Sequence, residues 1–287
     1  MKNILVPTDF SDNALKATMY GCEIALKRGA KVHLLHAAEM GHEAFYQPVS
    51  MYEKYNNLVL DENKERINTL RSLLQKNYPG CSFITTIDAQ AGVAAAVIKY
   101  STEKDIDLVV MGTQGASGIK AVVMGSVATS VMSASKVPVL AIPTDHVPDA
   151  PQNILLATNS FEKDLTLTNP LMNLVKLLGC TLHVVVFIDK ANADAADYVG
   201  NMAKMEQYKT FLHQHYPRLS IVSHVIEGES LEDSIELYSL RNNIGMIALI
   251  SHKKSFLERL FQQSVTRKMA FHSKIPILSI PAVVVSE

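Results

Sequence analysis

The chain is predicted to be an α/β protein of two tandem domains, each a five-stranded parallel sheet with helices on both faces, a Rossmann-like fold. Short apolar, β-branched runs alternate along it with longer segments of helical period, as in βαβ units. In addition, residues 2–9 (KNILVPTD) return at residues 152–159 as QNILLATN. A repeat at this distance indicates a duplicated domain, because solenoid units span only about 20–50 residues.

A second repeated segment closes each copy. Residues 135–143 read SKVPVLAIP and residues 273–281 read SKIPILSIP. The sequence therefore predicts a domain over 1–143 and a domain over 152–287. The intervening residues 144–151 are polar, carry two prolines and are predicted to be a short, stiff linker.

The helices and strands of the first domain are predicted from hydrophobic periodicity and from residues that favour the ends of helices. Ser11 is a good N-cap for the first helix, and Gly29 is suited to end it, because a helix often finishes on a residue with positive φ. The predicted strands are 3–6, 32–37, 82–87, 108–111 and 139–142, and the predicted helices are 11–28, 52–78, 93–103 and 126–135.

The second domain repeats this order. Stretches 39–51 and 189–204, each just after a second strand, are expected to be less regular, as a lid over the cleft or as an ordered packing loop. The predicted strands are 153–158, 181–188, 220–226, 246–250 and 277–280, with helices between them.

The last strand of each domain is very apolar and flanked by prolines. An unpaired strand of this kind at a sheet edge would promote aggregation. We therefore expect the two domains to pair within the chain through their terminal strands, and leave open whether two chains also form a homodimer.

Composition narrows the class of partner. The chain has 48% hydrophobic and 19% charged residues and a net charge of −1. It therefore has no net positive charge that would attract a polyanion, and nucleic acid is not expected as a partner. Neither a signal peptide nor an apolar run of about 18 residues is seen, so we expect a cytoplasmic protein without membrane contact. The three cysteines lack CxxC spacing and are expected in the core, and no metal site is expected from the histidines.

The most informative segment is residues 112–126, GTQGASGIKAVVMGS, which follows an apolar run and leads into a predicted helix. Glycines let backbone N–H groups approach a ligand, and the helix start attracts negative charge. This pattern favours a phosphate site built mainly from main chain. The alternative is a glycine-rich turn that only allows tight strand-to-helix packing.

With this loop, the chain resembles the universal stress proteins, and specifically their tandem two-domain members. In the ATP-binding branch of that family the loop has glycines followed by Ser or Thr, a pattern that Gly112, Gly115, Gly125 and Ser126 match without a gap. The resemblance covers nearly the whole chain. Together with Val-Pro-Thr-Asp at the end of the first strand, it implies a nucleotide at the carboxyl ends of the strands.

The resemblance also implies roles for individual residues. Ligand contact by Asp9 competes with a role as a turn carboxylate before Ser11, and Ser126 could equally be the N-cap of its helix. Gln114 stands where many ATP-binding relatives carry a basic residue, which weakens the expected hold on the terminal phosphates. The implied nucleotide-binding residues are Pro7, Thr8, Asp9, Ala37, Met111, Gly112, Gly115, Gly125, Ser126 and Val127.

The second domain departs from the family pattern. Ser251–Ser255 (SHKKS) replaces the first part of the loop, and Gln262 and Gln263 stand before the surviving Ser264. Asn159 replaces Asp9. We therefore expect this domain not to bind ATP in the family manner, although Lys253 and Lys254 leave room for another anion.

The leading functional hypothesis is an ATP-binding stress-response or signalling protein, with or without Mg²⁺, another adenine nucleotide being possible. No Walker-type, Gly-x-Ser-x-Gly or His-Glu-x2-His motif occurs, so no catalytic residue is assigned and at most slow ATP hydrolysis is expected. The alternatives are a nucleotide-free protein-interaction module and a true ATPase or nucleotidyl-transferring enzyme.

Overall fold

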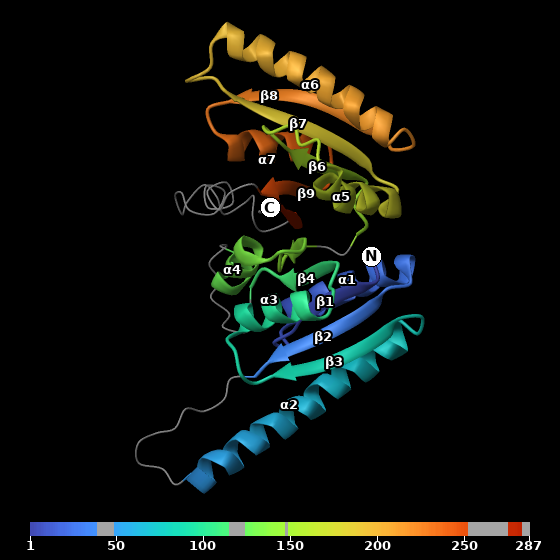
Figure 1. Cartoon of the computed structure of the whole chain (residues 1–287), viewed down its shortest axis with the longest axis vertical. Coiled ribbons are helices and arrows are strands. Elements are labelled where there is room, and N and C mark those ends of the chain that lie inside the picture. Colours follow the sequence, from blue (N-terminus) through green and yellow to red (C-terminus); the bar gives the residue numbers. More distant parts are fainter. Residues whose placement is uncertain (39–48, 115–123, 147–148, 252–274, 283–287) are drawn as a thin grey trace. The chain divides into compact units, whose positions relative to one another are not determined.

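The computed structural model describes residues 1–38, 49–114, 124–146, 149–251 and 275–282, although not the side chains of residues 49–52. These residues form two compact units, one ending at Thr144 and the other beginning at Asp145. Each unit contains a parallel sheet and helices (Figure 1). The predicted α/β class and tandem two-domain architecture are confirmed.

The strands of the first unit are all parallel, in the order β3-β2-β1-β4-β5. The chain moves one way along the sheet from β1 to β3 and then returns to β4 and β5. Because parallel crossovers are right-handed, α1 and α2 cover one face and α3 and α4 the other. The strands are β1 (Asn3–Pro7), β2 (Lys31–Ala37), β3 (Ser82–Asp88), β4 (Leu108–Gly112) and β5 (Val139–Ile142), and the helices are α1 (Asp12–Arg28), α2 (Val49–Asn77), α3 (Val93–Glu103) and α4 (Ser126–Ala134).

Helix α1 is capped at both ends. The hydroxyl of its N-cap, Ser11, accepts from the Ala14 amide at 3.2 Å, and Gly29 ends the helix with φ of 65°. Both predicted caps are therefore correct. The helix packs on β1 and β4, where Ile4, Leu5 and Val6 are fully buried.

Helix α2 has 29 residues and packs against β3, a strand of seven. It is thus roughly 44 Å long against about 23 Å for the strand. Its N-terminal half continues past the carboxyl ends of β2 and β3 (Figure 1). Tyr55 and Leu58, on that half, are 57% and 62% exposed.

The second unit repeats the strand order as β10-β9-β6-β7-β8, all parallel. Helix α5 packs on β10, α6 on β8, and α7 on β8 and β9. The strands are β6 (Asn153–Ala157), β7 (Thr181–Asp189), β8 (Ile221–Gly228), β9 (Ile244–Ser251) and β10 (Ile277–Pro281), and the helices are α5 (Leu165–Leu178), α6 (Ala195–His215) and α7 (Leu231–Arg241).

The expectation of an irregular stretch over residues 189–204 is wrong. β7 runs to Asp189 and α6 begins at Ala195. Asp194 caps this helix: its carboxylate accepts from the Asp197 amide at 2.8 Å, while Asp197 accepts from the Asp194 amide at 3.2 Å. The corresponding stretch 39–51 lies outside the described residues up to 48, and α2 begins at Val49. Within the part of the chain described, no helix is both long and apolar enough to cross a membrane.

Candidate functional site

The candidate site lies at the carboxyl ends of β1, β2 and β4. β1 is paired with both other strands, so Pro7 and Thr8, Ala37, and Met111 and Gly112 come to the same edge of one sheet. Pro7, Thr8 and Met111 are buried there, whereas Ala37 and Gly112 are half-buried. The structure thus brings together the residues predicted at the strand ends.

The segment after β1 is held in a defined turn. The Thr8 amide donates to the Leu35 carbonyl of β2 at 2.8 Å, and the Thr8 hydroxyl accepts from the Phe10 amide at 3.0 Å. One carboxylate oxygen of Asp9 accepts from the amide of Ser11 at 3.0 Å and from its hydroxyl at 2.6 Å. The turn-carboxylate role of Asp9 is therefore present, and it fixes the carboxylate beside the start of α1.

The described ends of the glycine loop are joined to each other. The Gly125 amide donates to the Thr113 carbonyl at 2.7 Å, and the Thr113 amide donates to the Ile142 carbonyl of β5 at 3.0 Å. A Cβ atom on Gly125 would lie 3.0 Å from the Thr113 carbonyl oxygen. The close approach of these two backbone segments thus favours glycine at 125. Gly115 lies outside the described residues.

Helix α4 begins without a side-chain cap. Its N-cap is Gly125, with φ of −60° and ψ of 153°, which has no side chain to accept from the first-turn amides. The alternative that Ser126 is the N-cap is wrong, because Ser126 is the first helical residue. Ser126 and Val127 are both exposed. A helix start of this kind presents backbone N–H groups and a positive dipole end to an anion.

Asn13, on the first turn of α1, is a contributor that sequence reasoning missed. Its side chain is 5% exposed, and its amide nitrogen donates to the Gln114 carbonyl at 3.0 Å. A Cβ on Gly112 would lie 2.6 Å from that nitrogen. Among the residues that the structure describes, the Asn13 side-chain oxygen has no hydrogen-bond partner. Asn13 therefore holds the beginning of the loop; no sequence signal distinguishes it from an ordinary helical asparagine.

The second unit keeps the backbone framework of this edge but changes several of its residues. The Thr158 amide donates to the Val185 carbonyl at 3.0 Å, as the Thr8 amide does to Leu35. This register aligns Phe187 with Ala37. A hollow of only about 70 Å³ remains there, and it is lined by Ala157, Thr158, Asn159, Val185, Phe187, Leu231 and Ile235. The aromatic ring of Phe187 lines this hollow, and the sequence analysis did not identify this difference from Ala37. Residues 252–255 and 262–264, on which that comparison relied, lie outside the described residues.

The fold places the chain among the doubly wound parallel α/β proteins, and comparison with known proteins gives the family. The family model described as "Universal stress protein family" matches residues 1–143 and 151–281. The chain belongs to this family and carries two copies of its domain.

Individual relatives match one domain or the whole chain. Universal stress protein MJ0531 of Methanocaldococcus jannaschii is 28% identical over 142 residues, covering 49% of this chain and 81% of the relative. YxiE of Bacillus subtilis is 29% identical over 149 residues, covering 48% and 97%. The solved structure of a universal stress protein from Archaeoglobus fulgidus has a TM-score of 0.70 at 20% identity, covering 97% of this chain and 98% of that one. This last likeness shows the two-domain fold.

Proposed function

We propose that the first unit binds an adenine nucleotide, with ATP as the first candidate, and that the protein acts in a stress response through this binding. The observation that carries the proposal is the uncapped start of α4 at Gly125, beside the end of β4. Negatively charged phosphates suit exposed helix-start amides, and Ala37, at the end of β2, is half-buried and has a small side chain beside which a flat base could lie.

Each predicted residue has a distinct part in this proposal. Pro7, Thr8, Asp9 and Ala37 would lie along the adenosine moiety. Met111 and Gly112 would form the floor beneath the loop, with Gly115 in the loop itself. Gly125, Ser126 and Val127 would donate backbone N–H groups to phosphate oxygens, and Mg²⁺ would add charge neutralisation. No group is assigned to catalysis.

The second unit is proposed not to bind ATP. Phe187 occupies the register position of Ala37, and Asn159 stands in place of Asp9. A nucleotide would thus bind to one of two units that share the same backbone framework. Pairing of the units through their terminal strands, a homodimer and a cytoplasmic location remain predictions.

The test is thermal unfolding of the full chain with ATP·Mg, ATP alone and cyclic AMP. Cyclic AMP is included because a solved universal stress protein is described in complex with it. A ligand at 100 times its Kd stabilises the folded state by about 2.7 kcal/mol, or roughly 5–10 °C in the melting temperature of a domain this size.

A matched pair of variants locates the binding. Ser126→Asp adds a negative charge at the first helical residue, where it suits the helix dipole but repels phosphate. Ser133→Asp adds the same charge seven residues, about 10 Å, further along α4. We expect the first variant to lose the nucleotide-dependent gain and the second to keep it. Flat titrations with all three ligands would instead select the nucleotide-free interaction module. Turnover above about 1 per second would select the enzyme.

A further inference from the structure

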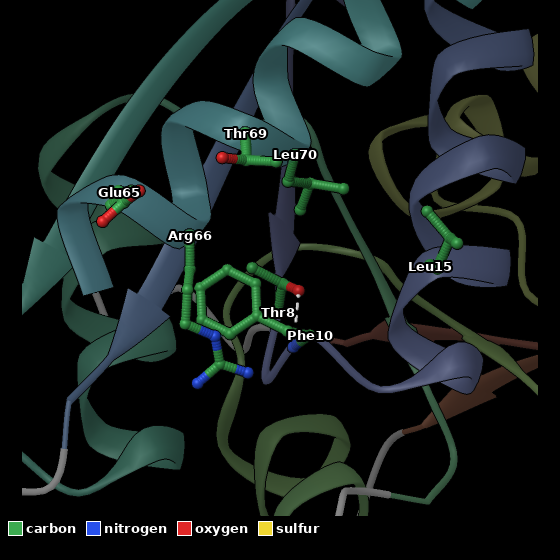
Figure 2. A pocket seen from close by; sticks show the side chains of 7 residues that line it. All are labelled: Thr8, Phe10, Leu15, Glu65, Arg66, Thr69 and Leu70. Atoms are coloured by element: carbon green, nitrogen blue, oxygen red, sulfur yellow. Dashed lines mark hydrogen bonds between the residues drawn. The ribbon is translucent and has the colours of Figure 1, made fainter. Parts of the chain in front are cut away.

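One cavity of the first unit has none of the described residues of the glycine loop in its lining. It measures about 350 Å³ and is formed by the start of α1, the middle of α2 and the turn after β1. Figure 2 shows Leu15 and Leu70 facing its interior from the two helices, with the Phe10 ring next to Arg66. A volume of this size falls within the range of small-molecule pockets. It is lined by Thr8, Phe10, Leu15, Glu65, Arg66, Thr69 and Leu70.

Phe10 forms the wall of the cavity in a strained conformation. Its φ is 63°, a left-handed value that costs a bulky residue of order 1–3 kcal/mol. The Phe10 amide donates to the Thr8 hydroxyl, and its ring lies 4.6 Å from the imidazole of His36, centroid to centroid. These contacts hold the ring in place against the strain. A fixed aromatic wall is suited to contact a flat apolar molecule.

Arg66 brings a positive charge to the same place. Its guanidinium carbon lies 4.2 Å from the centroid of the Phe10 ring, and the residue is exposed (Figure 2). Among the described residues Arg66 makes no ion pair within 4.0 Å. Glu65 precedes it on α2 and is displaced by roughly 100° around the helix, so the two charges do not share one direction. The guanidinium is thus available to an anion.

This cavity is separate from the proposed nucleotide site. The two share only Thr8. The phosphates are proposed at the start of α4, which covers the opposite face of the sheet from α1 and α2. Occupation of one position does not require the other to be filled.

We propose that this cavity, defined by Phe10, Leu15, Arg66 and Leu70, is a second ligand site for a small apolar molecule with one anionic group. The apolar body contacts the two leucines and the Phe10 ring, while a carboxylate or phosphate group pairs with Arg66. Arginine suits this role because its planar guanidinium donates two parallel hydrogen bonds to either group.

The experiment uses three probes of one shape and different charge: 1-naphthoate, 1-naphthalenemethanol and 1-naphthylmethylamine. Binding to the full chain is followed by NMR of ¹³C-labelled leucine methyl groups, with Leu15 and Leu70 assigned by substitution. We expect saturable shifts at both leucines with 1-naphthoate, a Kd about tenfold weaker with the neutral alcohol, and weaker binding still with the amine.

Two variants of neighbouring arginines on α2 form the control. Arg66→Gln should weaken 1-naphthoate about tenfold and leave the alcohol unchanged, which a merely destabilised fold would not do. Arg71→Gln removes the same charge from an exposed position that does not line the cavity and should change neither Kd. The proposal is overturned if no probe shifts Leu15 and Leu70 at millimolar concentration, or if 1-naphthoate binds wild type and Arg66→Gln equally. ATP binding at α4 is measured separately, so either proposal can fail alone.

Discussion

The imidazole Nδ1 of His183 lies 2.9 Å from the phenolic oxygen of Tyr238, which joins β7 to α7. The first unit contains the same pair: the Nδ1 of His33, on β2, lies 3.0 Å from the oxygen of Tyr100, on α3. Burial raises the pKa of Tyr238 to about 12, so this phenol remains protonated at neutral pH. Both copies thus contain a His–Tyr hydrogen bond between the sheet and a helix.

The two His–Tyr pairs predict a loss of stability in mild acid. Burial, and then the positive charges of Lys31 and Lys104, lower the pKa of His33 below its ordinary 6.5; burial and His224 lower the pKa of His183 in the same way. Below about pH 6.5 the unfolded chain therefore takes up protons before the folded chain does. Stability is full above that pH and falls as the pH decreases.

This prediction is checked by denaturant unfolding of wild type and the double variant His33→Gln, His183→Gln between pH 8 and pH 5. The variant should lose about 1 kcal/mol per hydrogen bond at pH 8 but show a shallower decline in acid. Equal slopes for the two proteins would show that other groups cause the acid dependence.

Gly125 and Gly92 provide a matched test of the loop's close packing. Both are N-cap glycines with φ of −60° and ψ of 153° and without a side-chain cap. A Cβ on Gly125 would lie 3.0 Å from the Thr113 carbonyl oxygen, whereas a Cβ on Gly92 has no atom within 4 Å. We expect Gly125→Ala to lower the free energy of unfolding by about 1–3 kcal/mol and Gly92→Ala to be nearly neutral, by urea titration. Similar effects at both positions would contradict the close-packing account.

Ala37→Phe transfers the obstruction of the second unit to the first. Ala37 is half-buried at the end of β2, so the larger ring should cost about 1–3 kcal/mol of stability and leave the domain folded. We expect the thermal shift with ATP to disappear. The reciprocal change, Phe187→Ala, should cost about 1–3 kcal/mol and enlarge the 70 Å³ hollow in a crystal structure. A full ATP shift in Ala37→Phe would show that the base lies elsewhere.

The cysteines should be inert in the folded protein. Cys22, Cys81 and Cys180 are 0%, 4% and 5% exposed, and burial raises the pKa of Cys22 and Cys81. Because the thiolate is the reactive form, labelling by iodoacetamide at pH 7.5 should be at least about 100-fold slower than in urea. Mass spectrometry of the labelled peptides measures this. Rapid labelling of Cys22 without denaturant would indicate local opening of α1.

Much of the fold can be predicted from the sequence alone, because apolar runs indicate the strands, and helical periodicity and a few capping residues indicate the helices. Ser11 and Gly29 indicated the ends of α1 correctly, since capping is a local property. The start of α6 was missed because Asp194 and Asp197 form a reciprocal cap within a polar stretch that looks like a loop. Hydrophobic periodicity depends on the positions of apolar residues and does not detect such polar pairs.

The sequence predicts only part of the candidate site, for a different reason. The glycine spacing indicates where backbone must come close, and Gly112 and Gly125 do lie against other atoms. The contact partners, Asn13 and the Thr113 carbonyl, come from distant segments that only the fold brings together. The alignment of Phe187 with Ala37 likewise depends on strand register. This register is not evident from the sequence, because the loops of the two copies differ in length.

Because every strand of a unit points the same way, the differing residues described at this edge lie close to or beyond strand ends: Ala37 and Phe187 near the ends of β2 and β7, and Asp9 and Asn159 in the turns after β1 and β6. Exchanging Ala for Phe, or Asp for Asn, there leaves the inner layer of isoleucine, leucine and valine untouched. After a gene duplication, the surface at this edge can therefore diverge in one copy while the buried layers that hold the unit together stay the same.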